Sequence, residues 1–94
     1  METELVTART LLWRAADALD RGAPDATQAC AMAKRLATDA GFRVVNAALQ
    51  LHGGYGYLRD YQIERFWRDL RVHSILEGTN QVMRMIVGRE LTRQ

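Results

Sequence analysis

Two short segments of this sequence combine residue types that could do chemistry. The first is Leu76–Gln81, in which a single carboxylate, Glu77, is followed by Gly78 and by a threonine suited to capping a helix. The second is Gln50–Tyr57, which places three glycines among aromatic side chains. An acid at the start of a helix could move a proton, and glycines let a ligand approach the backbone. Together the two segments predict a site that holds a small molecule and transfers a proton.

Glu77 has two interpretations. A carboxylate just before a helix N-terminus is stabilised by the helix dipole by about 0.3–1 kcal/mol, and it then needs no other role. Alternatively, the carboxylate lies on a short loop beside Gly78, where a substrate can approach it. A general base in that position gains strength when bound substrate excludes water. The residue types alone do not decide between these roles.

The glycine-rich segment also has a purely structural interpretation, because glycine after a long helical pattern is typical of a helix terminus. A phosphate-binding loop is disfavoured, since no Lys-Ser or Lys-Thr pair follows and Lys34 is the only lysine. An esterase-type oxyanion loop is disfavoured as well, since Ser74, the only serine, lies outside a Gly-x-Ser-x-Gly motif.

The histidines and the cysteine do not form a metal or nucleophile motif. His52 and His73 have no other ligand-type residues at metal-binding spacing, so we predict structural hydrogen bonds and no metal site. Cys30 lies in an alanine-rich run and is expected to be a buried thiol. A single cysteine also excludes an internal disulfide.

Length and charge limit the classes of protein. The 94 residues suffice for one small domain. The net charge is +2 with the charges interspersed, so nucleic-acid binding is not expected. No apolar run is long enough for a membrane span, and the acidic segment Met1–Glu4 does not resemble a targeting peptide. We therefore expect a cytoplasmic protein.

The elements that must position the two segments are helices. Apolar residues recur at helical spacing over residues 3–20, and Gly22 then provides a stop. Pro24 is expected in the first turn of a longer helix that runs to about Leu51, after which the glycines cannot easily be helical. Gly41 interrupts this helix at a cost of about 1 kcal/mol, and a small residue there would permit close approach of a neighbouring helix.

Two shorter helices follow in the pattern. The first covers residues 61–71 and is expected to bury Ile63, Phe66, Trp67 and Leu70. After an irregular connection over residues 72–78, Thr79 is the predicted N-cap of the last helix. No alternating strand pattern occurs, so we predict an all-α fold, an antiparallel helical bundle. Its alanine-rich faces indicate a missing member, supplied by another copy of the chain or by another domain.

An ordered series of motifs resembles the C-terminal domain of the acyl-CoA dehydrogenase family. The matching segments are Ala48–Tyr57, Arg65–Arg71, Ile75–Arg84 and Ile86–Leu91. The resemblance extends over nearly all of residues 1–94. It implies the helical fold of that domain, with residues 3–20 resembling its second helix and its first helix absent.

The resemblance also implies roles for individual residues. Glu77 matches the general base that removes the α-proton of an acyl-CoA thioester while flavin N5 of FAD accepts the β-hydride, and Gly78 lies at the substrate carbonyl. Residues that match positions lining FAD are Thr79, Asn80 and Gln81, and also Gln50, Leu51, His52, Gly53 and Gly54. The second group touches an FAD held mainly by a neighbouring subunit of the family's tetramers.

The N-terminal and middle domains of the family, which supply most of the flavin and substrate pocket, have no match in this sequence. The resemblance therefore implies a part of an oxidoreductase that is inactive alone. It would act with those domains or with another copy of the chain, in a homo-oligomer. Two alternatives stay open: a non-enzymatic helical assembly module from a truncated or split gene, and a flavin-binding accessory without chemistry.

Overall fold

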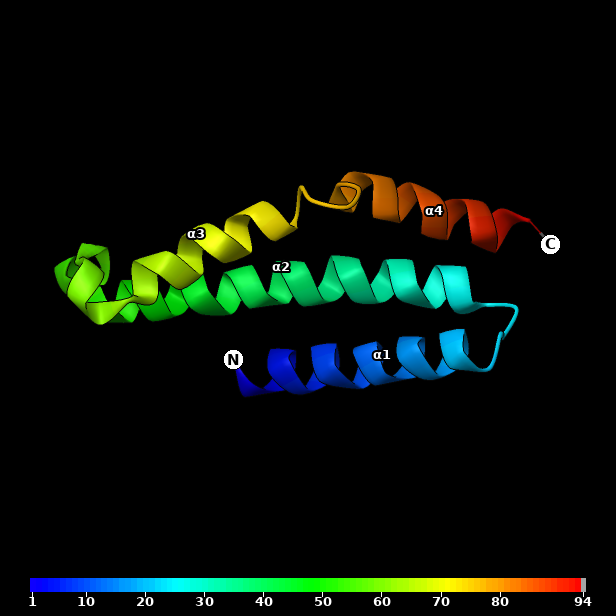
Figure 1. Cartoon of the computed structure of the whole chain (residues 1–94), viewed down its shortest axis with the longest axis horizontal. Coiled ribbons are helices and arrows are strands. Elements are labelled where there is room, and N and C mark those ends of the chain that lie inside the picture. Colours follow the sequence, from blue (N-terminus) through cyan, green and yellow to red (C-terminus); the bar gives the residue numbers. More distant parts are fainter. Residues whose placement is uncertain (94) are drawn as a thin grey trace.

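A computed structural model of the chain describes residues 1–93 as a set of helices joined by short turns (Figure 1). The four α-helices are α1 (Glu2–Asp20), α2 (Ala26–His52), α3 (Ile63–His73) and α4 (Asn80–Thr92). Two short 3-10 helices, η1 (Gly53–Tyr57) and η2 (Arg59–Tyr61), link α2 to α3. The residues described contain no strand, and the predicted all-α class is confirmed.

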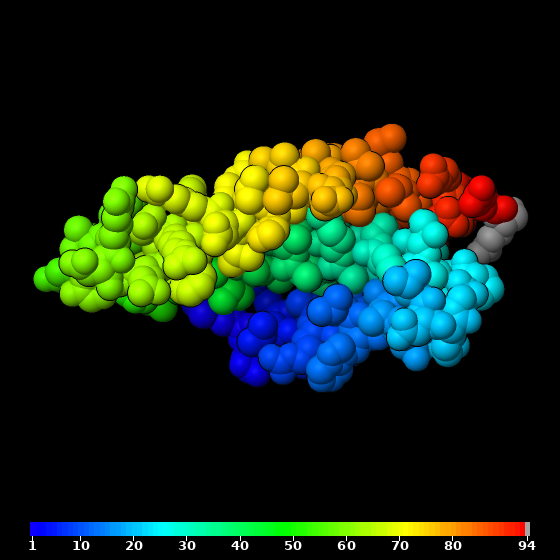
Figure 2. All heavy atoms as spheres, viewed as in Figure 1, coloured from blue at the N-terminus to red at the C-terminus, as the bar shows by residue number. Residues whose placement is uncertain are grey.

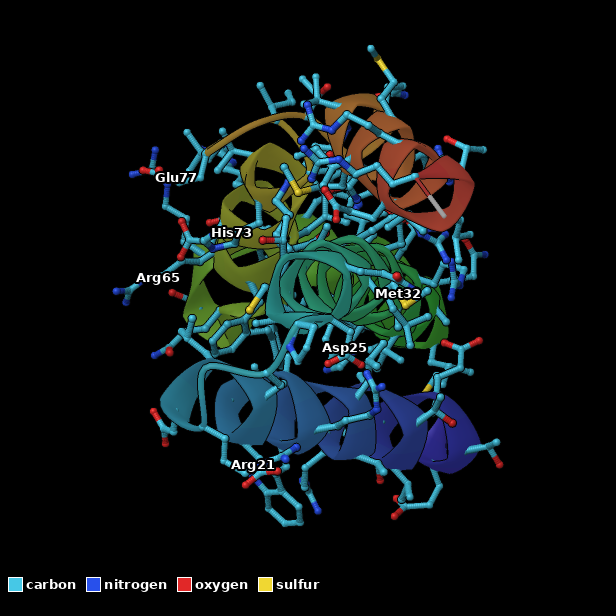
Figure 3. The ribbon with its side chains drawn as sticks, turned by 90° about the vertical axis from the view of Figure 1, so that its right-hand side faces the viewer. Arg21, Asp25, Met32, Arg65, His73 and Glu77 are labelled. Carbon is cyan, nitrogen blue, oxygen red and sulfur yellow. The ribbon has the colours of Figure 1, made fainter. Side chains whose placement is uncertain are left out.

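The longest helix, α2, is the central element. α1 packs along one side of α2 and runs antiparallel to it, whereas α3 and α4 follow one another along other sides of α2 (Figures 1 and 3). Within residues 1–93, α1 makes no close backbone contact with α3 or α4. The predicted antiparallel arrangement is therefore confirmed, with each helix packed on α2.

Alanine forms the contact between α1 and α2. The buried cluster there consists of Ala15, Ala18, Ala29 and Ala33, and the other buried apolar residues, Ala31 and Ala40, also lie on α2. Because their side chains are single methyl groups, the two helices can approach closely. The Cys30 side chain flanks this contact and is half-buried rather than buried as predicted, with its sulfur 4.0 Å from the Ala15 carbonyl oxygen.

The molecule exposes more surface than a closed domain of its size. Its radius of gyration is 15.5 Å, against about 12 Å expected for a compact domain of this length. Its accessible surface is 6815 Å², whereas about 5,500 Å² is typical of its mass. Figure 2 shows the elongated body. Exposed large side chains include Leu19, Leu51, Tyr57 and Met85, and so much apolar surface indicates an interaction surface.

The structure corrects the predicted start of α2 and the predicted glycine turn. α2 begins at Ala26 after the N-cap Asp25, so Pro24 lies in the preceding turn and not in the first helical turn. The glycines do not avoid helical structure: Gly53, with φ of 61°, ends α2, and the following residues form η1. Short 3-10 segments are common at the ends of α-helices, and this one uses i to i+3 hydrogen bonds such as that from the Leu58 N–H to the Tyr55 carbonyl.

Helix α3 starts two residues later than predicted, after Gln62, whose backbone is in the left-handed conformation. One side of α3 packs on α2. The rings of Phe42 and Trp67 lie 5.6 Å apart, and Trp67 Nε1 donates to Asn46 Oδ1 at 3.0 Å. Ile63, Trp67 and Leu70 are half-buried, but Phe66 is 53% exposed. The predicted burial of Phe66 is wrong: it lies beside Ile63 and Leu70 on the helix, but the single contact with α2 does not cover it.

Gly41 lies on α2 beside Leu70 of α3. A Cβ atom built on Gly41 would lie 3.6 Å from Leu70 Cδ2, which is ordinary van der Waals contact. The close approach of α3 therefore accommodates alanine as well as glycine at this position.

We expect Gly41→Ala to stabilise the chain by about 0.5–1 kcal/mol, because alanine loses less backbone entropy on folding and its methyl group fits. The midpoint of urea unfolding measures this change. Gly56→Ala is the contrasting variant, since its Cβ would lie 2.9 Å from the Leu49 carbonyl oxygen and should destabilise the fold. A lower unfolding midpoint for Gly41→Ala than for the parent chain would contradict the expectation.

Candidate functional site

Glu77 lies in the turn that joins α3 to α4, at the edge of the molecule (Figure 3). Glu77 and Gly78 both have positive φ, at 56° and 88°. This conformation costs a non-glycine residue roughly 1–2 kcal/mol, so surrounding contacts must hold the turn. One such contact is the hydrogen bond from the Asn80 N–H to the Ser74 carbonyl, at 3.0 Å.

The Glu77 carboxylate is exposed, and none of the ion pairs formed within residues 1–93 involves it. In the same part of the chain, the backbone N–H groups of Glu77, Gly78 and Thr79 donate to no protein acceptor. The turn therefore presents a carboxylate together with hydrogen-bond donors. A ligand with a carbonyl oxygen could accept from these donors while its neighbouring C–H group faces the acid.

Thr79 and Asn80 fix the start of α4. The Thr79 side chain accepts a hydrogen bond from the Val82 N–H at 3.2 Å, which confirms the predicted N-cap. Asn80 is only 3% exposed, and its side chain lies against α2. The Asn80 N–H also donates to the Ser74 carbonyl, whereas Gln81 is exposed and borders, with Asn80, an open cavity of about 340 Å³.

A polar cluster connects this turn to α2. Lys34 Nζ donates to the Gly78 carbonyl and to Asn80 Oδ1, both at 2.7 Å. Asn80 Nδ2 donates to Asp39 Oδ1 at 2.6 Å and to Thr38 Oγ1 at 2.9 Å. The sequence pattern does not predict this role of Lys34, because its partners lie 44 and 46 positions further along the chain.

The second segment, Gln50–Gly54, forms the other end of α2. A Cβ atom on Gly53 or Gly54 would meet no atom within 4 Å, so this backbone is open to a ligand. His52 Nδ1 lies 2.8 Å from the Ala48 carbonyl oxygen, which confirms the structural hydrogen bond predicted for this histidine. Gln50 borders a cavity of about 310 Å³ together with Tyr57.

The structure does not bring the two segments together within one chain. The turn at Gly78 is held at Lys34, and Gln50 follows Lys34 by sixteen residues of continuous helix, or about 24 Å. Figure 1 shows the same separation: the Gln50–Gly54 segment lies at one end of α2, and the α3–α4 turn lies near its middle. One small group cannot touch both segments of the same chain.

Other classes of site receive no support from the part of the chain described. Among residues 1–93, no three His, Cys, Asp or Glu side chains gather where they could hold a metal ion. No helix in this range combines the length and the apolarity that a membrane crossing requires.

Comparison with known proteins identifies the family to which the sequence is similar. The sequence model for "Acyl-CoA dehydrogenase, C-terminal domain" matches residues 1–92. The chain is 50% identical over 94 residues to the mitochondrial isobutyryl-CoA dehydrogenase of Bos taurus. This alignment covers 100% of the chain and 23% of that relative. The chain is 52% identical over 93 residues to the protein of the same name from Dictyostelium discoideum, covering 99% of the chain and 22% of that relative.

A solved structure agrees with these relatives. Butyryl-CoA dehydrogenase from Megasphaera elsdenii superposes with a TM-score of 0.93 at 40% identity, over 99% of this chain and 24% of that structure. The chain thus spans about a quarter of the length of the proteins it matches. Since the family model covers almost every residue, the chain belongs to the acyl-CoA dehydrogenase family, where it corresponds to the C-terminal domain.

Proposed function

We propose that this chain supplies the general base of a flavin-dependent acyl-CoA dehydrogenase, with Glu77 removing the α-proton of an acyl-CoA thioester. The observation that carries the proposal is the α3–α4 turn, where an exposed carboxylate without an ion pair adjoins backbone N–H groups that have no acceptor within residues 1–93. A thioester carbonyl bound to those N–H groups would acidify its α-carbon. The carboxylate beside it would then accept the proton.

FAD fits the chain as a ligand that several surfaces share. When bound, it supplies the acceptor for the hydride that leaves the β-carbon. The open backbone of Gly53 and Gly54, with Gln50, Leu51 and His52 before them, would contact one flavin nucleotide. Thr79–Gln81, at the N-terminus of α4, would line a second FAD molecule. The separation along α2 prevents the two segments from contacting the same part of one FAD molecule.

The exposure of Glu77 explains why the proposal requires further protein. A carboxylate in water is a weak base, and it becomes effective where a closed site excludes solvent. The residues described do not cover Glu77. We propose that the N-terminal and middle domains of the dehydrogenase, together with substrate, cover it. The identity to isobutyryl-CoA dehydrogenases favours a short branched acyl group as the first substrate to test.

A chimera tests the role of Glu77. Residues 1–94 would replace the matching 94 residues of the bovine isobutyryl-CoA dehydrogenase. We expect isobutyryl-CoA to bleach the flavin absorbance of this chimera. Glu77→Gln should slow bleaching by about 10²–10⁴-fold, because it removes the base while keeping the shape of the side chain.

The matched control for this experiment is Asp69→Asn, which removes an exposed carboxylate from the neighbouring helix α3. It should bleach at the rate of the parent chimera. Undiminished bleaching by Glu77→Gln would remove Glu77 from the role of base.

A second candidate function, a helical assembly module, is favoured by two apolar grooves. One, of about 360 Å³, is lined by Leu19, Cys30 and Ile86 among others, and the other, of about 250 Å³, by Leu5, Val44 and others. Both lie beside α2. The accessible surface exceeds that of a closed domain by about 1,300 Å², and a standard interface covers about 800 Å² of each partner. A second copy of the chain could cover this surface.

Sedimentation velocity at several concentrations tests self-association. We expect species larger than the 10.7 kDa monomer to increase with concentration, because association covers the grooves. Leu19→Lys places a charge at a groove and should shift the distribution toward monomer. Thr10→Lys is the control, since Thr10 is an exposed polar residue of α1 and lines neither groove. A compact monomer at every concentration would contradict the assembly function.

A further inference from the structure

The turn that carries Glu77 is strained and contains few hydrogen bonds of its own. Glu77 and Gly78 are consecutive residues with positive φ, and a Cβ atom on Gly78 would lie 2.7 Å from Met83 Cε. The N–H groups of Ile75 and Leu76 bond back to the Val72 carbonyl, so they belong to the end of α3. The bond from the Asn80 N–H to the Ser74 carbonyl spans the turn, whereas the N–H groups of Glu77 and Gly78 themselves have no acceptor within residues 1–93.

The side chain of Lys34, on α2, forms a hydrogen bond to the turn next to Glu77. Lys34 Nζ donates to the Gly78 carbonyl at 2.7 Å, across 44 positions of sequence. The same ammonium group donates to Asn80 Oδ1 at 2.7 Å, on the other side of Thr79. Two of the three donors of Lys34 therefore bracket the residues that follow Glu77.

The Asn80 side chain that accepts from Lys34 is itself held in place by hydrogen bonds to α2. The Asn80 amide, 3% exposed, lies between two opposite charges: its oxygen accepts from Lys34 and its nitrogen donates to Asp39 at 2.6 Å. Asp39 Oδ2 lies 3.7 Å from Arg84 and 3.9 Å from Arg35. Hydrogen bonds to ionised groups are roughly twice as strong as neutral ones, so the amide is held firmly at both ends.

The hydrogen bonds of the polar cluster have two different effects, one on the α2–α4 contact and one on the turn that carries Glu77. The bonds from Asn80 to Asp39 and Thr38 join α4 to α2 without involving the turn. The bond from Lys34 to Gly78 adds a contact to the backbone one residue beyond Glu77. We propose that Lys34 is a positioning residue for the proton transfer, which fixes the Glu77 carboxylate through the Gly78 carbonyl and the Asn80 side chain.

The inference rests on the proposed role of Glu77 as base, and it concerns how accurately that base is placed. A displacement of about 1 Å at a reacting group can slow a reaction by about 10²-fold. Lys34 comes from the middle of a 27-residue helix, whereas Glu77 lies on a loop. The contact with a long helix thus restricts the position of the loop that carries the Glu77 carboxylate.

The first test uses the full 94-residue chain and needs no cofactor. Lys34→Met keeps the length of the side chain and removes the ammonium group. Amide hydrogen exchange should become at least tenfold faster at Asn80, whose N–H closes the turn, and stay unchanged at Ala29 in the α1–α2 contact. Arg9→Met, which removes an exposed cation from α1, should leave both amides unchanged. Unchanged exchange at Asn80 in Lys34→Met would overturn the inference.

The second test measures flavin reduction in the chimera in a single turnover with saturating isobutyryl-CoA. The amplitude counts competent sites, and the rate constant reports how well each site is arranged. We expect Lys34→Met to lower the rate constant 10–100-fold with unchanged amplitude. Lys34→Arg, which restores a cation, should recover part of that loss. A lower amplitude with the parent rate constant would reveal a merely structural role and overturn the inference.

Further outcomes separate this inference from the proposed function. Lys34→Gln, neutral but polar, is made in parallel in case Lys34→Met does not fold, and a parent rate constant in Lys34→Gln would overturn the positioning role. If Glu77→Gln is inactive while Lys34→Met keeps the parent rate constant, Glu77 remains the base and the positioning role fails. If the parent chimera does not bleach, the proposed function fails, and hydrogen exchange alone decides whether Lys34 fixes the turn.

Discussion

Every helix of this chain depends on contact with α2. α1 reaches α2 through alanine methyl groups, α3 through the Phe42–Trp67 pair, and α4 through the Asn80 amide. Because α1 has no close contact with α3 or α4 within residues 1–93, these three interfaces do not reinforce one another. The placement of any residue on α3 or α4 is therefore only as accurate as its attachment to this one helix.

The three interfaces differ in what they specify. Alanine contacts permit close packing but fix little, since methyl groups offer few interlocking shapes. The polar cluster has directional bonds, and Asn80 satisfies its buried amide only when Lys34 and Asp39 stand on either side of it. Consequently the α2–α4 contact fixes both the register and the orientation of α4, and it does so next to the turn that carries Glu77.

The sequence predicted what local patterns determine and failed where distant parts of the chain meet. Helical periodicity located all four helices, and the Thr79 cap was found because it bonds only three residues away. Phe66 was assigned to the core because its spacing on α3 is apolar, but only the packing of α3 shows which side faces α2. The contact of Lys34 with Gly78 joins residues 44 positions apart, which no local pattern encodes. The roles of Glu77 and of the glycine segment stay predictions from resemblance.

The separation of Glu77 from Gln50–Gly54 constrains how a site could be built from this chain. About 24 Å of continuous helix separates Gln50 from Lys34, which binds the turn at Gly78, so neither segment can move to complete the other. In the roles proposed for them, each would complete a site whose remaining walls lie in further domains or in another copy of the chain. The exposed apolar surface along α2 and its neighbours is of the kind whose burial favours association. The same feature, a long central helix with thin alanine-rich contacts, thus leaves one side of each helix uncovered and keeps the two segments with proposed roles apart.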